Sequence, residues 1–262
     1  MKRTLAAPAF LAALFLVSPA LAGDLPEWAK AIEEKLDTVP FTFQGEDVPF
    51  EDIVQVFRES GEFNIVLDPR ALEAFGEQGL KVSLNVRELK LGNALKLLTT
   101  LHGFSTKLSC GALVLSTAPL LDSFPTDPPG APEGASEDDR ALYAKLAAQR
   151  VGRVEFEAHP LLEVLEFLRD NFDLNLMADP ELTRREDKLL ISLRLNDVTV
   201  GQTLHLIAAI LDLEVRIENA VIVVAAAPDA GARPDQCPFC GAQREAEFKF
   251  CPQCGKNIER FK

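Results

Sequence analysis

The sequence predicts an α+β protein built from two copies of one small unit, each with the element order β-α-β-β-α-β-β. In each unit the two helices are expected to pack on one face of a small sheet. The first observation behind this prediction is a repeated hexapeptide. Residues 64–69 (Asn-Ile-Val-Leu-Asp-Pro) return as residues 175–180 (Asn-Leu-Met-Ala-Asp-Pro), an offset of 175 − 64 = 111. The second is that apolar residues recur at helical and strand spacing in the same order in both copies.

A short amphipathic helix is predicted to precede each unit. The first spans residues 24–37 and the second spans residues 137–150, each with apolar side chains at helical spacing. The chain has one Trp and one Tyr, and both fall in these helices. Matching Trp28 to Tyr143 places them at corresponding positions, so the repeat is expected to include the leading helix.

The next helix of each unit presents one apolar face at i, i+3, i+4 and i+7. The residues of this face are Phe50, Ile53, Val54 and Phe57 in the first copy, and Leu161, Val164, Leu165 and Leu168 in the second. A short apolar strand follows in each copy, at residues 63–67 and 172–177, and it is closed by Asp-Pro.

An alternating strand, a second helix and a closing hairpin complete each unit. The strand positions are Val82, Leu84 and Val86, matched by Ile191, Leu193 and Leu195, and the helix positions are Leu91, Ala94, Leu95 and Leu98, matched by Val200, Thr203, Leu204 and Ile207. The offset falls to 109 because the loop before the strand is two residues shorter in the second copy. Loops absorb such changes, whereas packed elements do not. The last strands are predicted at residues 113–115 and 221–224.

These patterns divide the chain into segments. They are a signal peptide at 1–22, a first unit with its leading helix at 24–117, a Pro-rich linker at 118–136, a second unit with its leading helix at 137–225, a second linker at 226–236 and a Cys-rich tail at 237–262. The composition of the first linker is that of a stiff, extended segment that buries no core.

The N-terminal segment has the parts of an export signal. A basic start, Met1-Lys2-Arg3, precedes an apolar stretch at residues 5–17, and Ala20-Leu21-Ala22 forms a small-residue cleavage site. We therefore expect a periplasmic or secreted protein that begins at Gly23. The alternative is an uncleaved membrane anchor formed by residues 5–22, which would be the chain's one contact with a membrane.

The charge of the chain bears on its partners. The formal charge is −13, and Lys2 and Arg3 of the signal contribute +2, so the exported chain would carry −13 − 2 = −15. A body this acidic repels phosphate backbones, which disfavours nucleic acid as a partner of the two units.

Two matching phrases resemble a known family. Residues 82–98 (VSLNVRELKLGNALKLL) and residues 191–207 (ISLRLNDVTVGQTLHLI) are similar to the secretin and TonB short N-terminal domain. The resemblance covers about residues 39–116 and 151–225. It implies a strand, a short turn and a helix that packs on the sheet, a periplasmic location, and contact with a protein partner in the envelope. It implies no catalysis.

The tail has the spacing of a zinc ribbon. Cys237 and Cys240 form one CxxC pair, and Cys251 and Cys254 form a second, ten residues further along. Each pair can offer two thiolates to one tetrahedral Zn²⁺, and four protein ligands make the site structural. Because an exported chain meets an oxidising compartment, disulfide or redox use of these cysteines is the alternative.

The remaining chemically active residues form no catalytic pattern. Cys110 lies at a predicted hairpin turn, where exposure and intermolecular pairing or a half-buried thiol are both open. His102, His159 and His205 have no counterpart in the other copy and no catalytic partner at suitable spacing.

The predicted function is therefore that of an exported, non-enzymatic protein-binding or assembly module of the cell envelope, associated with secretion. One alternative is a thiol redox protein that uses the CxxC pairs. Another is a membrane-anchored regulator with a cytoplasmic zinc ribbon.

Overall fold

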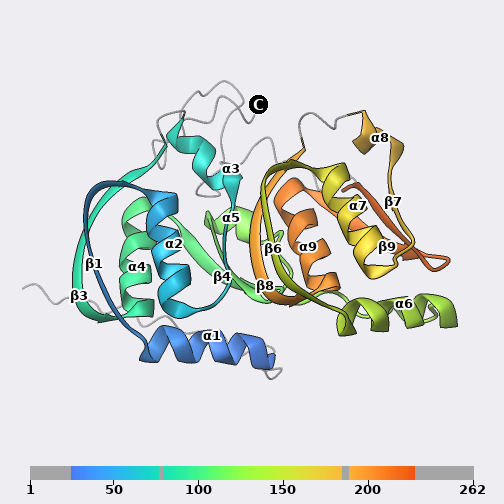
Figure 1. The fold of residues 1–262 in the computed structure, drawn as a ribbon, viewed down its shortest axis with the longest axis horizontal. Helices are drawn as coiled ribbons and strands as arrows, with labels where there is room; N and C mark the ends of the chain where they lie inside the picture. The colour runs from blue at the N-terminus through green and yellow to red at the C-terminus, as the bar shows by residue number, and fades with distance from the viewer. Residues whose placement is uncertain (1–24, 77–78, 185–188, 228–262) are drawn as a thin grey trace, which may run out of the picture.

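The computed structural model describes residues 25–76, 79–184 and 189–227, and within them the chain folds into two similar α+β repeats (Figure 1). The signal segment and the Cys-rich tail lie outside these residues. The mixed α+β class and the predicted element order are confirmed in both repeats.

The elements of the first repeat are α1 (Glu27–Thr38), β1 (Pro40–Pro49), α2 (Phe50–Gly61), β2 (Ile65–Leu67), α3 (Pro69–Leu72), the 3₁₀ turn η1 (Glu73–Phe75), β3 (Lys81–Lys90), α4 (Leu91–His102), β4 (Ser105–Ser109) and β5 (Ala112–Ser116). A short helix, α5 (Ala118–Leu121), follows. The elements of the second repeat are α6 (Glu137–Ala148), β6 (Arg150–Pro160), α7 (Leu161–Phe172), β7 (Leu176–Ala178), α8 (Pro180–Thr183), β8 (Leu190–Thr199), α9 (Val200–Leu211), β9 (Leu213–Glu218) and β10 (Val221–Ala226).

Each repeat contains two separate sheets, so the prediction that the helices cover one face of a single sheet is wrong. In the first repeat β1 pairs with β3, while β2, β5 and β4 form a three-stranded sheet in that order. The second repeat has the same arrangement, β6 with β8 and β7-β10-β9. In the first repeat α2 and α4 lie between the two sheets, and in the second α7 and α9 do so (Figure 1). In the first repeat, strand residues of both sheets join one apolar cluster with helix residues, which explains why the sheets stay apart.

The apolar faces predicted from periodicity are confirmed. All four predicted residues of α2 and all four of α7 are buried. The predicted positions of α4 and α9 are also buried, and those of β3 and β8 alternate between buried and exposed neighbours. Spacing of 3.6 and 2 residues was enough to find the interior of each repeat.

The leading helices α1 and α6 are equivalent at an offset of 110. Lys35 Nζ donates to the carbonyl of Glu62 over 2.8 Å, and Lys145 Nζ donates to the carbonyl of Asp173 over 2.5 Å. Both acceptors are the left-handed residues that end the following helix. Each lysine therefore satisfies a carbonyl that has no partner inside its own helix.

This register corrects the predicted match between the two unique aromatic residues. At an offset of 110 the counterpart of Trp28 is Asp138, and Tyr143 lies 143 − 138 = 5 residues further along its helix. The predicted match rested on the short similarity of Trp-Ala-Lys to Tyr-Ala-Lys. The helix termini and the lysine contacts show that this similarity is out of register.

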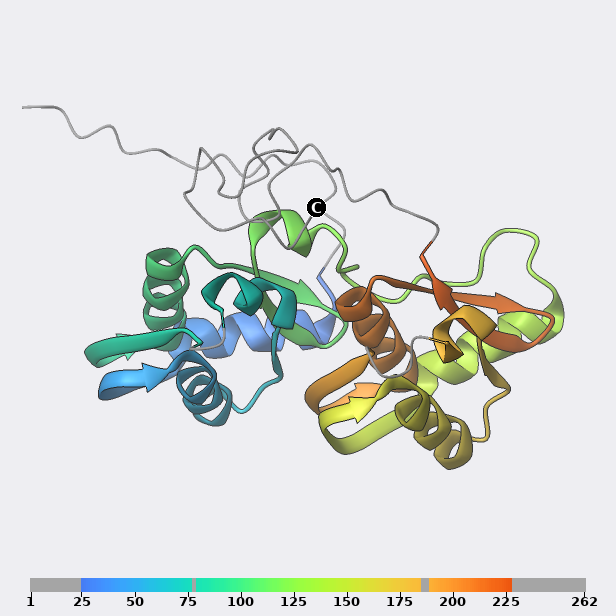
Figure 2. The same cartoon turned by 90° about the horizontal axis from the view of Figure 1, so that it is seen from above.

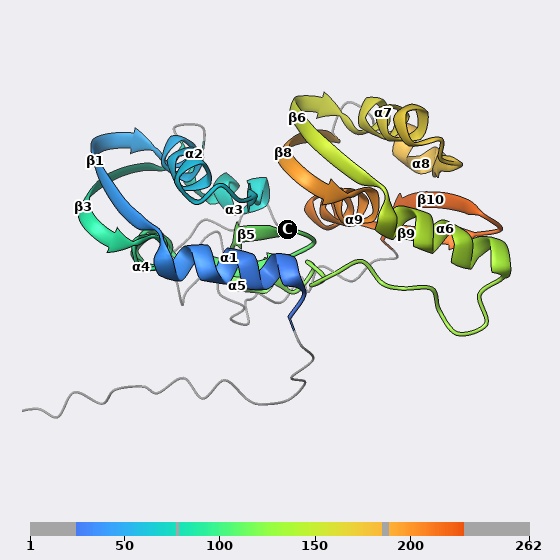
Figure 3. The same ribbon diagram turned by 60° about the horizontal axis from the view of Figure 1, so that its bottom comes forward.

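The segment after the first repeat is more ordered than a stiff linker. Residues 118–121 form α5, and Leu121 and Phe124 are buried. The backbone N–H of Cys110 donates to the carbonyl of Thr126 over 2.7 Å. The prediction that residues 118–136 bury no core is therefore wrong for the first part of that segment. The remainder crosses from α5 to α6 (Figure 3).

The two repeats lie side by side, with the three-stranded sheet of the first facing α9 of the second (Figure 2). Val66, Ala112 and Val114 belong to the first repeat, yet they are part of the apolar cluster of the second. With Ser116 they form one side of the sheet, which we call the outer sheet face. The opposite side, with Ile65 and Leu113, packs on the helices of its own repeat.

Within residues 25–76, 79–184 and 189–227, no helix combines the length and the apolar character needed to cross a bilayer.

Candidate binding site at the junction of the repeats

The junction is the contact between the outer sheet face of the first repeat and the second repeat. At one end of it, the side-chain amide of Asn64 pairs with the backbone of Asn196 as a neighbouring strand would. Asn64 Nδ2 donates to the carbonyl of Asn196 over 2.9 Å, and the N–H of Asn196 donates to Asn64 Oδ1 over 2.8 Å. The same Nδ2 also donates to the carbonyl of Gly111 over 3.1 Å. Asn64 is buried, whereas its repeat partner Asn175 is exposed. The paired bonds fix the register of β8 against the first repeat.

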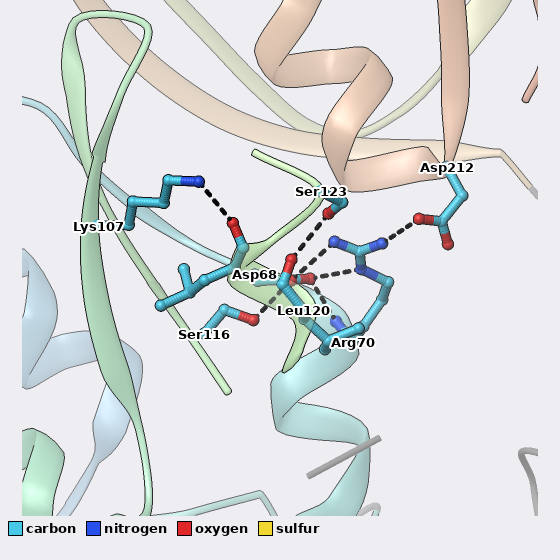
Figure 4. A network of polar contacts seen from close by, with 8 residues as sticks. Asp68, Arg70, Lys107, Ser116, Leu120, Ser123 and Asp212 are labelled. Carbon is cyan, nitrogen blue, oxygen red and sulfur yellow. Dashed lines mark hydrogen bonds and ion pairs between the residues drawn. The ribbon is translucent and has the colours of Figure 1, made fainter. Parts of the chain in front are cut away.

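An arginine spans the other end of the junction (Figure 4). The carboxylate of Asp68 is fully buried and accepts from Arg70 Nε and Nη2, both over 2.9 Å, and from Ser116 Oγ over 2.7 Å. Arg70 also forms an ion pair with Asp212, at the end of α9. Its guanidinium carbon lies 5.7 Å from the ring centre of Phe124. One side chain thus ties α3, α9 and the linker together.

The environment of Arg70 keeps it charged. Burial alone would lower its pKa, but the hydrogen bonds and charges of Asp68 and Asp212 outweigh burial and raise the pKa above its ordinary value. Asp68 does end its strand and caps α3, as its position before Pro69 suggested. The ion pair was not predicted. The sequence holds one sign of it: the position of Arg70 is not conserved between the copies, because its counterpart, residue 181, is Glu.

A pocket of about 350 Å³ lies where the linker meets both repeats. Its walls come from the start of α1, residues 127–130, α6, α9 and β9. The lining residues that bear on binding are Trp28, Asp127, Tyr143, Leu204, His205 and Ile217. Although the two unique aromatic residues are not repeat equivalents, the fold brings both to this one pocket. They stand out in the sequence as the chain's one Trp and one Tyr, but nothing in the sequence indicates that they meet.

Several polar groups at this pocket form hydrogen bonds with one another. Trp28 Nε1 donates to Asp127 Oδ1 over 3.1 Å, which joins α1 to the linker. Gln202 and Thr199 form a capping box at the start of α9. His205 is half-buried, and burial lowers its pKa to about 4. The imidazole is therefore neutral near pH 7, and the pocket offers an apolar lining with few polar groups.

The neutral state of His205 predicts a pH dependence of stability. Its pKa falls from 6.5 to about 4 on folding, so the unfolded chain binds the proton first as the pH drops. The free energy of unfolding should therefore decrease between pH 6.5 and 4, by on the order of 3 kcal/mol, and it does not depend on His205 above pH 6.5. Urea unfolding of the wild type and of His205→Gln measures it. Parallel curves for the two chains would contradict the assignment.

The other candidate residues lie apart from the pocket. His102 packs edge-on to Phe50, and His159 packs edge-on to Phe156. Among the described residues no three His, Cys, Asp or Glu side chains come close enough to hold a metal ion. The zinc ligands predicted from the sequence, Cys237, Cys240, Cys251 and Cys254, lie outside the described residues.

Cys110 is not exposed, and this corrects the interpretation of its turn position. The residue is fully buried in a two-residue hairpin turn with Gly111, both at positive φ, 47° and 79°. Its sulfur lies 3.7 Å from the carbonyl oxygen of Pro125. Burial raises the pKa of the thiol to about 12. The expected exposure and the half-buried thiol are both wrong, because the linker covers the turn, and intermolecular pairing would require the linker to open first.

A scan of protein-family models found no family that matches the chain, and searches of curated proteins and of solved structures found no match either.

Proposed function

We propose that this chain is an exported, non-enzymatic protein-binding module of the cell envelope, and that the pocket at the junction holds an apolar side chain of its protein partner. The observation that supports this most is the pocket wall, which combines Trp28 and Tyr143 with Leu204 and Ile217. Trp and Tyr are the residues that contribute most to protein interfaces, and an apolar pocket of this size suits an anchoring side chain.

Two further features support a protein partner. The linker residues 127–130 form one wall of the pocket, so an occupant would touch both repeats and the segment between them. The exported chain is acidic, with a charge of −13 − 2 = −15 once Lys2 and Arg3 are removed, which favours neutral or basic partners over nucleic acid. The resemblance to the secretin and TonB short N-terminal domain points to an envelope partner as well.

Site-specific photocrosslinking tests this proposal. A benzophenone amino acid in place of Tyr143 should yield one discrete adduct in envelope fractions, and the same group in place of the exposed Leu190 should yield none. Ala147→Glu adds a carboxylate to the pocket wall at an exposed helix position and should abolish the adduct. An adduct that survives Ala147→Glu, or no adduct at all, would count against the pocket as the binding site.

We further propose that Cys237, Cys240, Cys251 and Cys254 hold one structural zinc ion. We expect metal analysis to find one zinc per chain, and Cys251→Ser should lose it because three ligands leave the site open. A metal-free chain with four oxidised thiols would instead support the thiol redox alternative.

The anchored-regulator alternative has its own test. N-terminal sequencing of the protein from its host should find Gly23 first if the signal segment is removed. An intact Met1 would favour a membrane anchor formed by residues 5–22.

A further inference from the structure

Comparison of the repeats shows which surfaces the junction covers. Where equivalent apolar residues differ strongly in burial, and the buried one shares an apolar cluster with residues of the other repeat, the difference marks a contact between repeats. On α9, Leu206 is 0% exposed and Ile210 is 3% exposed. Their counterparts on α4, at an offset of 109, are Leu97 at 41% and Leu101 at 66%. The junction therefore covers the side of α9 that carries Gln202, Leu206 and Ile210. We call this side, and the equivalent side of α4, the helix face.

The sheet shows the reverse difference. Val66 is 3% exposed and Val114 is fully buried in the first repeat. Their counterparts in the second repeat are Met177, which is 61% exposed, and Val223, which is half-buried. The junction covers the outer sheet face of the first repeat. The matching face of the second repeat is exposed at Met177 and half-buried at Val221 and Val223, and it is buried at one end, at Ala225.

Each repeat thus leaves open the face that the other repeat uses. The first repeat presents an exposed helix face on α4, and the second presents a partly exposed outer sheet face on β7-β10-β9. Apolar character is kept on the helix and on the central part of the sheet, as Leu97 and Leu101 replace Leu206 and Ile210, and Met177 replaces Val66. The edge strand β9 carries charged side chains on this side, namely Glu214, Arg216 and Glu218. Within this chain the two kinds of face already pack together at the junction (Figure 2).

We propose that a second copy of the chain docks head to tail, with the outer sheet face of one copy on the α4 helix face of the next. This contact would repeat the internal junction between molecules. It is heterologous, since two different surfaces meet, and each copy keeps one surface free for a further copy. Such a contact continues into an open chain of molecules or closes into a ring.

A repeated polar contact agrees with this arrangement. Asn175 is the counterpart of Asn64 and is exposed at the rim of the open sheet face. In the docked pair its amide would meet the backbone of Arg87 of the next copy, because 196 − 109 = 87 and Asn64 pairs with the backbone of Asn196. Asn at this position of the repeated hexapeptide thus has a role in both copies.

The contact between molecules should be weaker than the internal junction. The ion pair of Arg70 with Asp212 has no equivalent, because the counterparts of these residues are Glu181 and Gly103. The buried Phe124 also contributes inside the chain only. We therefore expect association that depends on protein concentration.

Sedimentation velocity of the purified exported chain, from micromolar to submillimolar concentration, tests the proposal. The wild type should form species larger than a dimer as the concentration rises. Leu101→Glu and Met177→Glu should each weaken self-association at least about tenfold, because a carboxylate would be buried in the contact. Both residues are exposed within one chain, so the unfolding midpoint of each variant should stay at the wild-type value.

Mixing the variants distinguishes this contact from any symmetric one. The Met177→Glu chain retains its helix face and the Leu101→Glu chain retains its sheet face, so the mixture should form dimers and nothing larger. Leu190→Glu, at an exposed leucine outside both faces, should associate like the wild type. A wild-type chain that stays monomeric, a mixture that stays monomeric, or variants that still associate alone would each overturn the proposal.

Discussion

Replacement of Arg70 by alanine should lower the free energy of unfolding by about 3–5 kcal/mol, the usual cost of leaving a buried charge unpaired. The carboxylate of Asp68 is fully buried, and Arg70 supplies three of its hydrogen bonds, from its backbone N–H, Nε and Nη2. The alanine variant keeps the backbone contact and loses both side-chain contacts. It also loses the link to Asp212 in the second repeat. Urea unfolding followed by circular dichroism measures the loss.

Two controls separate this effect from a general loss of surface charge. Arg216→Ala removes an exposed arginine whose nearest carboxylate, on Glu218, is 3.7 Å away, and it should cost less than about 0.5 kcal/mol. The double variant Asp68→Ser with Arg70→Ala should recover part of the loss, since it leaves no unpaired charge. Equal costs for Arg70→Ala and Arg216→Ala would show that the buried pair contributes little.

Truncation of Leu206 should be the second large effect, and the repeat supplies its own control. Leu206→Ala should cost about 2–5 kcal/mol, because the side chain is fully buried between the repeats and its removal leaves a cavity. Leu97→Ala changes the equivalent position of α4, where the leucine is 41% exposed, and should cost less than about 1 kcal/mol.

Thermal unfolding at low protein concentration checks this pair, because any contact between molecules is then negligible. Both substitutions make the same chemical change at the same turn of equivalent helices, so helix propensity cancels in the comparison. Equal shifts of the two midpoints would mean that the first repeat does not cover Leu206.

The interior of each repeat could be predicted from the sequence, because the same apolar periodicity occurs in both copies at a nearly constant offset. Phe50 and Leu161, or Leu91 and Val200, begin apolar faces that agree in both copies, and all four are fully buried. The separation into two sheets was not predicted. Strand patterns show which side of a strand is apolar but not which strands pair.

The junction could not be predicted from the apolar positions that the two repeats share. It depends on what differs in burial, and burial is a tertiary property. A signal was present nonetheless, since Leu97 and Leu206 are apolar in both copies although they lie off the predicted core positions of their helices. The pocket was missed for a related reason. Trp28 and Tyr143 come from different repeats, and only the docking of the repeats brings them together.

The buried thiol of Cys110 is a natural probe of the local opening of the linker. With Pro125 and Thr126 bonded over the turn, a thiol reagent can react only after residues 124–126 lift away. When the turn recloses faster than the reagent reacts, the labelling rate, found by mapping the modified peptide, equals the rate for an exposed thiol multiplied by the equilibrium constant of that local opening. Comparison with the rate for the unfolded chain then gives the free energy of the opening. The same measurement on the Arg70→Ala chain would show whether the linker and the junction open together or one at a time.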